Sequence, residues 1–137
     1  MDKILLDSSV LTGHLLGNSA CRQFLQKLLL SGRSPALSVM VLGSLEIEED
    51  CEKEINSLLE LFDIVPVTAP IAKKANQIEK ALQNGEQHDT ILSTEQTFAA
   101  ATAIYEGYTL VTLPEFVSRY SANSALGELF VFSVPNS

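Results

Sequence analysis

The chain has 137 residues, 46% of them hydrophobic, which is enough to bury one sizeable core, so we expect a single domain over residues 1–137. The formal net charge of -8 argues against a passive nucleic-acid binder but is compatible with an acidic site that holds a divalent cation. The sequence has no apolar run of membrane-spanning length, no signal-peptide pattern and two isolated cysteines, so we expect a cytoplasmic protein with no membrane partner and no cysteine metal site.

The chain opens with an apolar strand, "KILLD" at residues 3–7, which ends at an acid. Ser8 or Ser9 can cap the N-terminus of the helix that we expect next. Residues 19–32, "SACRQFLQKLLLSG", place apolar side chains at helical spacing and end at a glycine. The first quarter of the chain therefore predicts one strand followed by two helical segments.

The middle of the chain continues this alternation. A strand ends near Ala36, and Ser38 can cap a helix that we expect to be interrupted near Asp50. "IVPVT" at residues 64–68 predicts the next strand. Residues 69–85 predict an amphipathic helix with a proline in its first turn and a glycine at its end, the residues that favour those two positions.

The last third of the chain contains its most regular stretch. Residues 94–107, "TEQTFAAATAIYEG", predict a helix with Thr94 as its cap and Gly107 just after its end. "YTLVT" at residues 108–112 and "ELFVFSVP" at residues 128–135 are apolar strands. Because strands and helices alternate throughout, we predict an α/β domain with a central, mostly parallel sheet that is covered on both faces.

The alanines of the helix at residues 94–107 allow it to approach the sheet closely. In parallel sheets, ligands bind beyond the carboxyl ends of the strands. Asp7 and Thr112 follow two of the predicted strands, and we expect those strands to be neighbours. The sequence therefore directs attention to this edge of the sheet as the candidate site.

Four segments of the sequence resemble the PIN domains, especially the short VapC-type toxin ribonucleases. They are "ILLDSSVL" near the start, "LSVMVLGSL" at residues 37–45, "AATAIYEGYTLVT" at residues 100–112 and "PEF" at residues 114–116. The resemblance covers nearly the whole chain and implies a three-layer α/β/α sandwich. It also implies a ribonuclease that depends on Mg²⁺ or Mn²⁺, an antitoxin that blocks the site, and a homodimer.

The resemblance implies a cluster of three or four carboxylates, and we compare it position by position. Asp7 matches the first acid. Ser44 stands where a glutamate is expected, with Glu46 two residues further on as a possible substitute. Gln96 stands where an aspartate is expected, and Glu115 is the acid available after the last family segment. Candidate metal ligands are therefore Asp7 and Glu115, with Gln96 and Ser44 or Glu46 completing the candidate catalytic set.

This comparison predicts an eroded acidic site. Glu95 is next to Gln96, but it is rotated from it by about 100° on a helix of 3.6 residues per turn. A site with one or two carboxylates holds Mg²⁺ weakly, since this ion gives up its waters reluctantly. We therefore expect a PIN-like protein with weak or no ribonuclease activity on RNA; the alternative is a catalytically silent PIN-like module that acts through protein contacts or dimerisation.

Two plainer roles for the charged residues stay open at this point. Asp7 can simply cap the helix that follows it, which is a common use of aspartate. Glu115 can be a solvated surface acid. A receiver-type phosphoacceptor domain also places an acid after a strand, but this chain lacks the paired acids and the later lysine that such domains require.

Overall fold

The computed structural model describes residues 3–45, 52–83, 92–121 and 126–135. Its strands form one sheet in the order β3-β2-β1-β4-β5, in which every neighbouring pair is parallel. The strands are short, apolar runs at both ends and in the middle of the chain: β1 Ile4–Leu6, β2 Ala36–Ser38, β3 Asp63–Val65, β4 Thr109–Thr112 and β5 Phe130–Ser133. The expected parallel sheet is confirmed.

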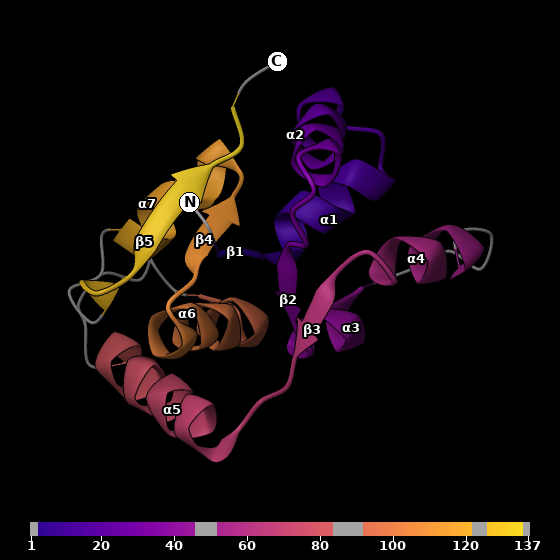
Figure 1. Ribbon diagram of the computed structural model, residues 1–137. Coiled ribbons are helices and arrows are strands. Elements are labelled where there is room, and N and C mark those ends of the chain that lie inside the picture. Colours follow the sequence, from indigo (N-terminus) through magenta and orange to yellow (C-terminus); the bar gives the residue numbers. More distant parts are fainter. Residues whose placement is uncertain (1–2, 46–51, 84–91, 122–125, 136–137) are drawn as a thin grey trace.

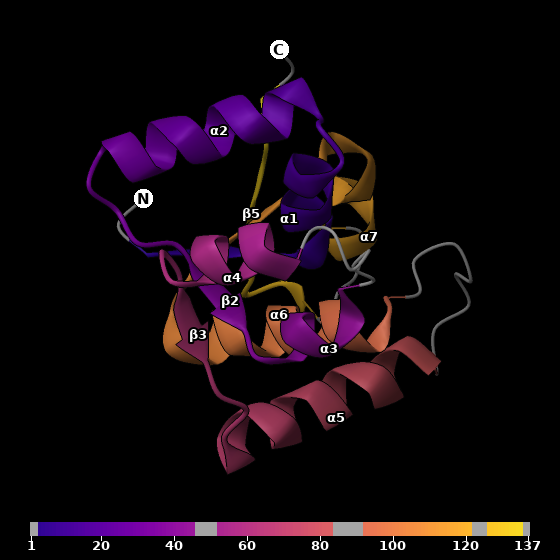
Figure 2. The ribbon, with the colours of Figure 1, turned by 90° about the vertical axis from the view of Figure 1, so that its right-hand side faces the viewer.

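Helices lie on both sides of this sheet (Figures 1 and 2). They are α1 Ser8–Leu15, α2 Ser19–Leu30, α3 Met40–Ser44, α4 Glu52–Leu59, α5 Ala69–Gln83, α6 Thr94–Glu106, the 3₁₀ helix η3 Pro114–Phe116 and α7 Val117–Ser121. The architecture is the three-layer α/β/α sandwich that the sequence predicted. In the part of the chain that the structure describes, no helix is both long enough and apolar enough to cross a membrane.

The two faces of the sheet carry separate cores. Leu5 and Leu110 pack against α5, α6 and α7 on one face, and Leu6 and Val111 pack against α1 and α2 on the other. Successive side chains of a strand point to opposite faces, so each three-residue strand supplies both cores. The inner strands β1, β2 and β4 are almost completely buried because helices cover both of their faces, whereas the edge strands β3 and β5 are partly exposed.

Helix α6 lies close against the sheet, as its alanines predicted. Ala99, Ala100 and Ala101 are fully buried, and α6 contacts β1, β2 and β4. The helix ends at Gly107, whose φ of 77° lies in the left-handed region that favours glycine. The chain then turns directly into β4.

The pairing of β1 with β4 places the candidate site. Leu6 lies opposite Val111, and the backbone N–H of Asp7 donates to the carbonyl of Val111 at 3.0 Å. Both strands end at the same edge, so Asp7 and Thr112 become neighbours. This confirms the expected neighbouring strands.

Several local predictions differ from the structure. The cap of α1 is Asp7, not Ser8 or Ser9, and the cap of α6 is Ser93, not Thr94, because in each case the preceding side chain reaches the free N–H groups. The helix predicted from Ser38 is present as two pieces, α3 and α4, and the break proposed near residue 50 lies outside the described residues. The sequence did not predict η3 and α7.

Candidate functional site

Asp7 lies at the carboxyl edge of the sheet, between β1 and α1. It is 0% exposed and has the extended backbone of a helix cap, with φ -81° and ψ 169°. Its side chain accepts a hydrogen bond from the backbone N–H of Ser9 at 3.1 Å, as an N-cap does. The plainer role foreseen for Asp7, as a helix cap, is therefore present in the structure.

Three hydroxyl groups also donate to the Asp7 carboxylate. Ser9 Oγ donates to Oδ1, Thr112 Oγ1 donates to Oδ2 at 2.5 Å, and Tyr120 Oη donates to Oδ2 at 3.1 Å. These donors come from α1, β4 and α7, so one carboxylate joins the start of α1 to two elements whose donors lie 105 and 113 residues from Asp7 in the sequence. We call Asp7, Ser9, Thr112 and Tyr120 the Asp7 cluster.

Burial and hydrogen bonding shift the pKa of Asp7 in opposite directions. Burial raises the pKa of Asp7 above its ordinary value of 3.8, while the bonds from Ser9, Thr112 and Tyr120 partly offset this rise. Burial likewise raises the pKa of the Tyr120 phenol, and the neighbouring Asp7 carboxylate raises it further. Tyr120 therefore stays protonated and acts as a donor at neutral pH.

Gln96 has a structural role at the start of α6. Its side-chain Oε1 accepts from the backbone N–H of Ser93 at 2.9 Å, and the backbone N–H of Gln96 donates to Ser93 Oγ at 3.1 Å. This is a capping box, the reciprocal arrangement that satisfies two free donors at a helix start. The amide oxygen that stands at the expected aspartate position is thus engaged within α6.

Glu95, rather than Gln96, reaches toward Asp7. Its Oε1 accepts from the backbone N–H of Ser8 at 3.1 Å, although the two residues are 87 positions apart. Two carboxylates therefore meet the first turn of α1, Asp7 on Ser9 and Glu95 on Ser8, where the free N–H groups and the helix dipole favour negative charge. Glu95 lies on a different side of α6 from Gln96, and that side faces the start of α1.

Ser44 is the last residue of α3, a helix that packs against α6. The backbone of the expected second-acid segment thus lies beside the helix that carries Glu95 and Gln96. The side chain of Ser44 and all of Glu46 lie outside the described residues, so their part in the site stays a prediction.

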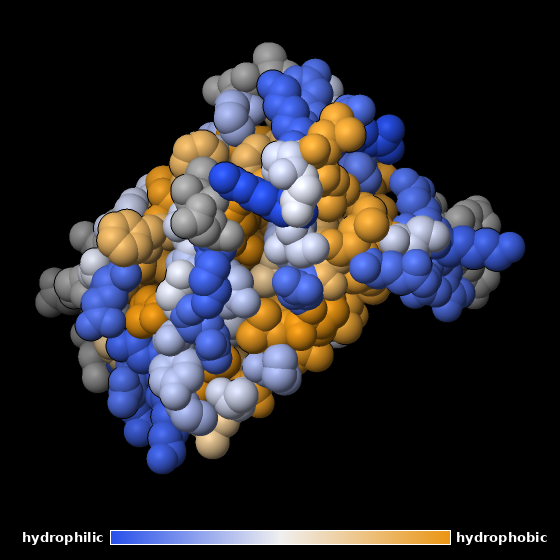
Figure 3. All heavy atoms as spheres, viewed as in Figure 1, coloured by the Kyte–Doolittle hydropathy of each residue, from blue (hydrophilic) through white to orange (hydrophobic). Residues whose placement is uncertain are grey.

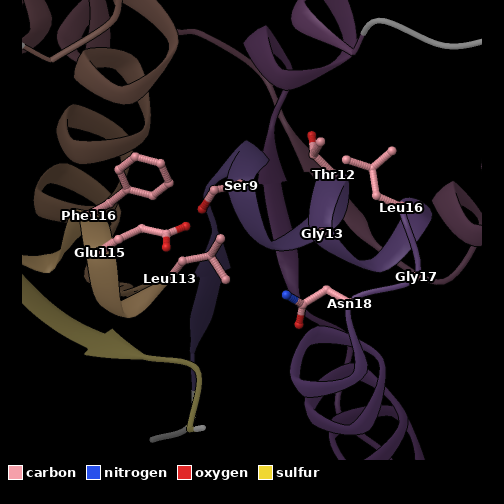
Figure 4. A pocket seen from close by; sticks show the side chains of 9 residues that line it. All are labelled: Ser9, Thr12, Gly13, Leu16, Gly17, Asn18, Leu113, Glu115 and Phe116. Atoms are coloured by element: carbon pink, nitrogen blue, oxygen red, sulfur yellow. The ribbon is translucent and has the colours of Figure 1, made fainter. Parts of the chain in front are cut away.

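Glu115 is exposed and lines a groove of about 610 Å³ beside the Asp7 cluster. Figure 4 shows its carboxylate pointing across the groove toward Ser9, with Leu113 and Phe116 on the same side and Leu16 and Asn18 opposite. The buried Cys21 thiol lies close to both acids: after burial itself, the charges of Glu115 and Asp7 raise its pKa. The groove therefore adjoins the edge of the sheet but does not contain the Asp7 carboxylate.

Among the described residues, the Asp7 carboxylate has no open oxygen for a divalent cation of the Mg²⁺ type. Such an ion needs open carboxylate oxygens and room for its waters. Both oxygens of Asp7 are occupied by hydrogen-bond donors, Gln96 is engaged in its cap, and one oxygen of Glu95 is engaged with Ser8. Within the described ranges, no group of three or more histidine, cysteine, aspartate or glutamate side chains could hold a metal ion.

The fold is similar to that of several solved structures of other proteins. The chain is similar to VapBC2 from Rickettsia felis, solved with a promoter DNA fragment, at TM-score 0.72 and 17% identity over 95% of this chain and 97% of that one. It is similar to a toxin–antitoxin complex from Klebsiella pneumoniae at TM-score 0.73 and 15% identity, covering 98% and 100% of the two chains. It is similar to FitAcB from Neisseria gonorrhoeae at TM-score 0.66 and 23% identity, covering 94% and 96%.

This chain has the fold of the VapC-type PIN domains. The likeness spans 94% or more of the chain in each of these comparisons, so it includes the sheet and the helices on both faces. No family model and no curated protein matches the sequence. At these identities the likeness defines the fold of the PIN-like chain, and its activity has to be argued from its own side chains.

Sequence reasoning missed the residue that completes the Asp7 cluster. Tyr120 lies in the polar stretch "SRYSANS", where nothing in the spacing marks it as buried. Glu95 is rotated from the expected aspartate position, yet it is the acid of this pair that contacts the start of α1. Thr112 was expected at the edge of the sheet, and a hydroxyl placed directly after a buried strand was the one available signal for its bond to Asp7.

Proposed function

We propose that this PIN-fold chain acts by binding a protein partner of the antitoxin type, and that it has little or no metal-dependent ribonuclease activity. The likeness to toxin–antitoxin complexes supports the class of partner. The state of Asp7 supports the loss of activity, since its carboxylate is buried and accepts from four donors. A cytoplasmic location, expected from the sequence, belongs to the same proposal.

The loss of activity follows from the chemistry of metal-assisted hydrolysis. A bound ion must activate water and stabilise charge on the phosphate, which requires carboxylates that hold it firmly. In this chain a metal would have to displace hydroxyl donors from a buried acid before it could bind. Serine and glutamine at positions 44 and 96 add no charge to offset that cost.

Calorimetric titration with Mn²⁺ and a labelled-RNA cleavage assay test this part of the proposal. We expect the unaltered protein to bind Mn²⁺ weakly and to cleave RNA no faster than a no-enzyme control. The double variant Ser44→Glu with Gln96→Asp should increase Mn²⁺ affinity, because two charges are added, without reaching the cleavage rate of an active enzyme. Tight Mn²⁺ binding and rapid cleavage by the unaltered protein, both abolished by Asp7→Asn, would establish the enzyme instead.

The groove beside Glu115 has the chemistry of a partner-binding surface. Leu16 is 82% exposed at its rim, and Leu113 and Phe116 line it. Glu115 is exposed within it and, among the described contacts, forms no ion pair or hydrogen bond. An apolar groove with one unpaired acid favours a segment that carries aliphatic side chains and a lysine or arginine, and the charge of -8 favours a basic partner overall.

Co-expression with the product of the neighbouring reading frame tests the groove. We expect a stable complex where that product is a small basic or DNA-binding protein, and we expect Glu115→Lys to weaken the complex at least tenfold by reversing the charge in the groove. Glu60→Lys, an equal change at an exposed acid outside the groove, is the matched control. Equal loss of binding in both variants would show general charge attraction rather than docking in the groove.

Homodimerisation is the remaining part of the proposal, and exposed apolar side chains support it. Phe130 is 74% exposed on the edge strand β5, which carries no charge, and natural proteins rarely leave such an edge uncovered. Figure 3 shows a second apolar area in the region of β2 and β3, where Ile64 is partly exposed. Sedimentation velocity on Phe130→Asp and Ile64→Asp identifies which edge holds the second copy, and a monomer in the unaltered protein would reject this part.

A further inference from the structure

The unexplained feature of this site is how completely its one matching acid is enclosed. Asp7 is 0% exposed, and each of its two oxygens accepts from two donors. A carboxylate has about four lone-pair sites, so this one is fully satisfied without metal or water. We propose that Asp7 is the structural hub of the fold, and that Tyr120 is the positioning residue that keeps its carboxylate in the interior.

The sheet already brings the start of α1 next to the end of β4, and the hub adds α7 to this pair. Thr112 and Tyr120 lie 105 and 113 residues from Asp7 in the sequence, and their bonds connect the start of α1 to the end of β4 and to α7. Helix α7 has five residues, fewer than an isolated helix needs to be stable in water. Its position therefore depends on tertiary contacts, and the hydrogen bond from Tyr120 to Asp7 is a polar one among them.

The aromatic ring and the hydroxyl group of Tyr120 both suit it to this role. It ranks first by volume among the fully buried side chains, and its ring packs in the core on the α6 side of the sheet. Its hydroxyl needs a partner once it is buried, and Asp7 Oδ2 is that partner. The ring and the carboxylate thus stabilise each other: either one alone would leave a buried polar group without its bond.

The sign of a stability change separates a hub from a metal ligand. Carboxylates gathered to hold an ion have unfilled lone pairs and repel one another, so replacing one of them by its amide tends to stabilise a protein. A carboxylate with four donors behaves in the opposite way. Its amide presents N–H groups to donors and leaves some of them unpaired, which destabilises the fold. These contacts all lie within the chain, so the stability change does not depend on a partner or on RNA.

Thermal unfolding without added metal tests the hub. We expect Asp7→Asn and Tyr120→Phe each to lower Tm by about 5 °C, and Tyr105→Phe, an equal change at an exposed tyrosine, to change it by less than about 1 °C. The double variant should lose less than the sum of the single losses, because both remove the same bond. A rise in Tm for Asp7→Asn, or losses that simply add, would overturn the proposal.

A spectroscopic readout separates positioning from general packing and needs no variant at Asp7. The carboxyl carbon of Asp7, followed by ¹³C NMR as the pH changes, should titrate at a higher pH in Tyr120→Phe than in the unaltered protein, because one donor to the ionised form is gone. Tyr105→Phe should leave that titration unchanged. An Asp7 titration that does not respond to Tyr120→Phe would contradict the positioning role, whatever the result for ribonuclease activity or partner binding.

Discussion

Asp7 and Glu115 are two acids near the same edge of the sheet: Asp7 accepts a hydrogen bond from Ser9, and the Glu115 carboxylate points toward Ser9 (Figure 4). Asp7 is fully buried and accepts from four donors, whereas Glu115 is exposed and lines a groove. In the sequence comparison Asp7 matches the first acid of one metal-binding pattern, and Glu115 is the acid available for its last position. The difference between them teaches that a place at the carboxyl edge of a parallel sheet does not decide what an acid does; its neighbours decide it.

The local chain explains why the two acids differ. Asp7 follows a buried strand directly, and Tyr120 of α7 reaches its carboxylate from the opposite side. Glu115 lies in η3, where the backbone has already left the sheet and turned toward solvent. One acid is therefore a part of the interior, and the other is available to a partner.

The largest effect that bears on this comparison should come from Tyr120→Ala. It removes the buried ring and leaves the Asp7 oxygen without that donor, so we expect a loss of about 3–5 kcal/mol in the free energy of unfolding. Urea denaturation measures it. Tyr105→Ala, at a tyrosine that is 54% exposed, should cost less than about 1 kcal/mol, and comparable losses at the two sites would contradict the buried hub.

Alanine at each of the two acids compares them directly. Asp7→Ala leaves the donors of Ser9, Thr112 and Tyr120 without their acceptor and should cost about 1–3 kcal/mol. Glu115→Ala changes an exposed side chain and should stay within about 0.5 kcal/mol of the unaltered protein. Equal stability of the two variants by urea denaturation would remove the distinction between the acids.

Gln96 offers an intermediate case, a site position that serves as a helix cap. Gln96→Ala should lower the free energy of unfolding by about 1 kcal/mol, since the reciprocal bond with Ser93 is lost. Gln96→Glu keeps an acceptor at the helix N-terminus and should be neutral within about 0.5 kcal/mol. If both variants are equally destabilised in urea, the capping box is not the role of this residue.

The pH dependence should be the smallest effect. Burial raises the folded-state pKa of Asp7 above 3.8, so the folded protein binds this proton more strongly than the unfolded chain does. The contribution of this proton to stability is fully present below the pKa of Asp7 in the unfolded chain. It is lost as the pH rises through the pKa of Asp7 in the folded protein. The Tm difference between the unaltered protein and Asp7→Asn should therefore narrow from about pH 4 upward; a difference that widens would indicate a lowered pKa.

The sequence predicts the scaffold well because its signals are local. The run ending at Leu6 is apolar at every position, and Leu110 and Val111 form the buried centre of the run ending at Thr112. The alanines from Ala99 to Ala103 mark a closely packed helix. Both patterns follow from burial on two faces and need no knowledge of distant contacts. The order of strands and helices followed from them.

The hydrogen-bond partners of the site residues could not be predicted from local sequence patterns. The enclosure of Asp7 depends on Tyr120, which is 113 residues away and lies in a stretch with no helical pattern of its own. Whether Glu95 or Gln96 contacts α1 depends on the orientation of α6 relative to α1. The spacing of residues along one helix does not determine that orientation. Long-range packing fixed both outcomes.

The response of Tm to Mn²⁺ tests the central claim most directly. A ligand that binds the folded state raises Tm, so a site that binds Mn²⁺ tightly must show it. We predict that the unaltered protein unfolds at the same temperature, within about 1 °C, with and without Mn²⁺ at about 1 mM, because the Asp7 carboxylate is already held by Ser9, Thr112 and Tyr120. A rise of several degrees that Asp7→Asn abolishes would show that this acid is a metal ligand after all.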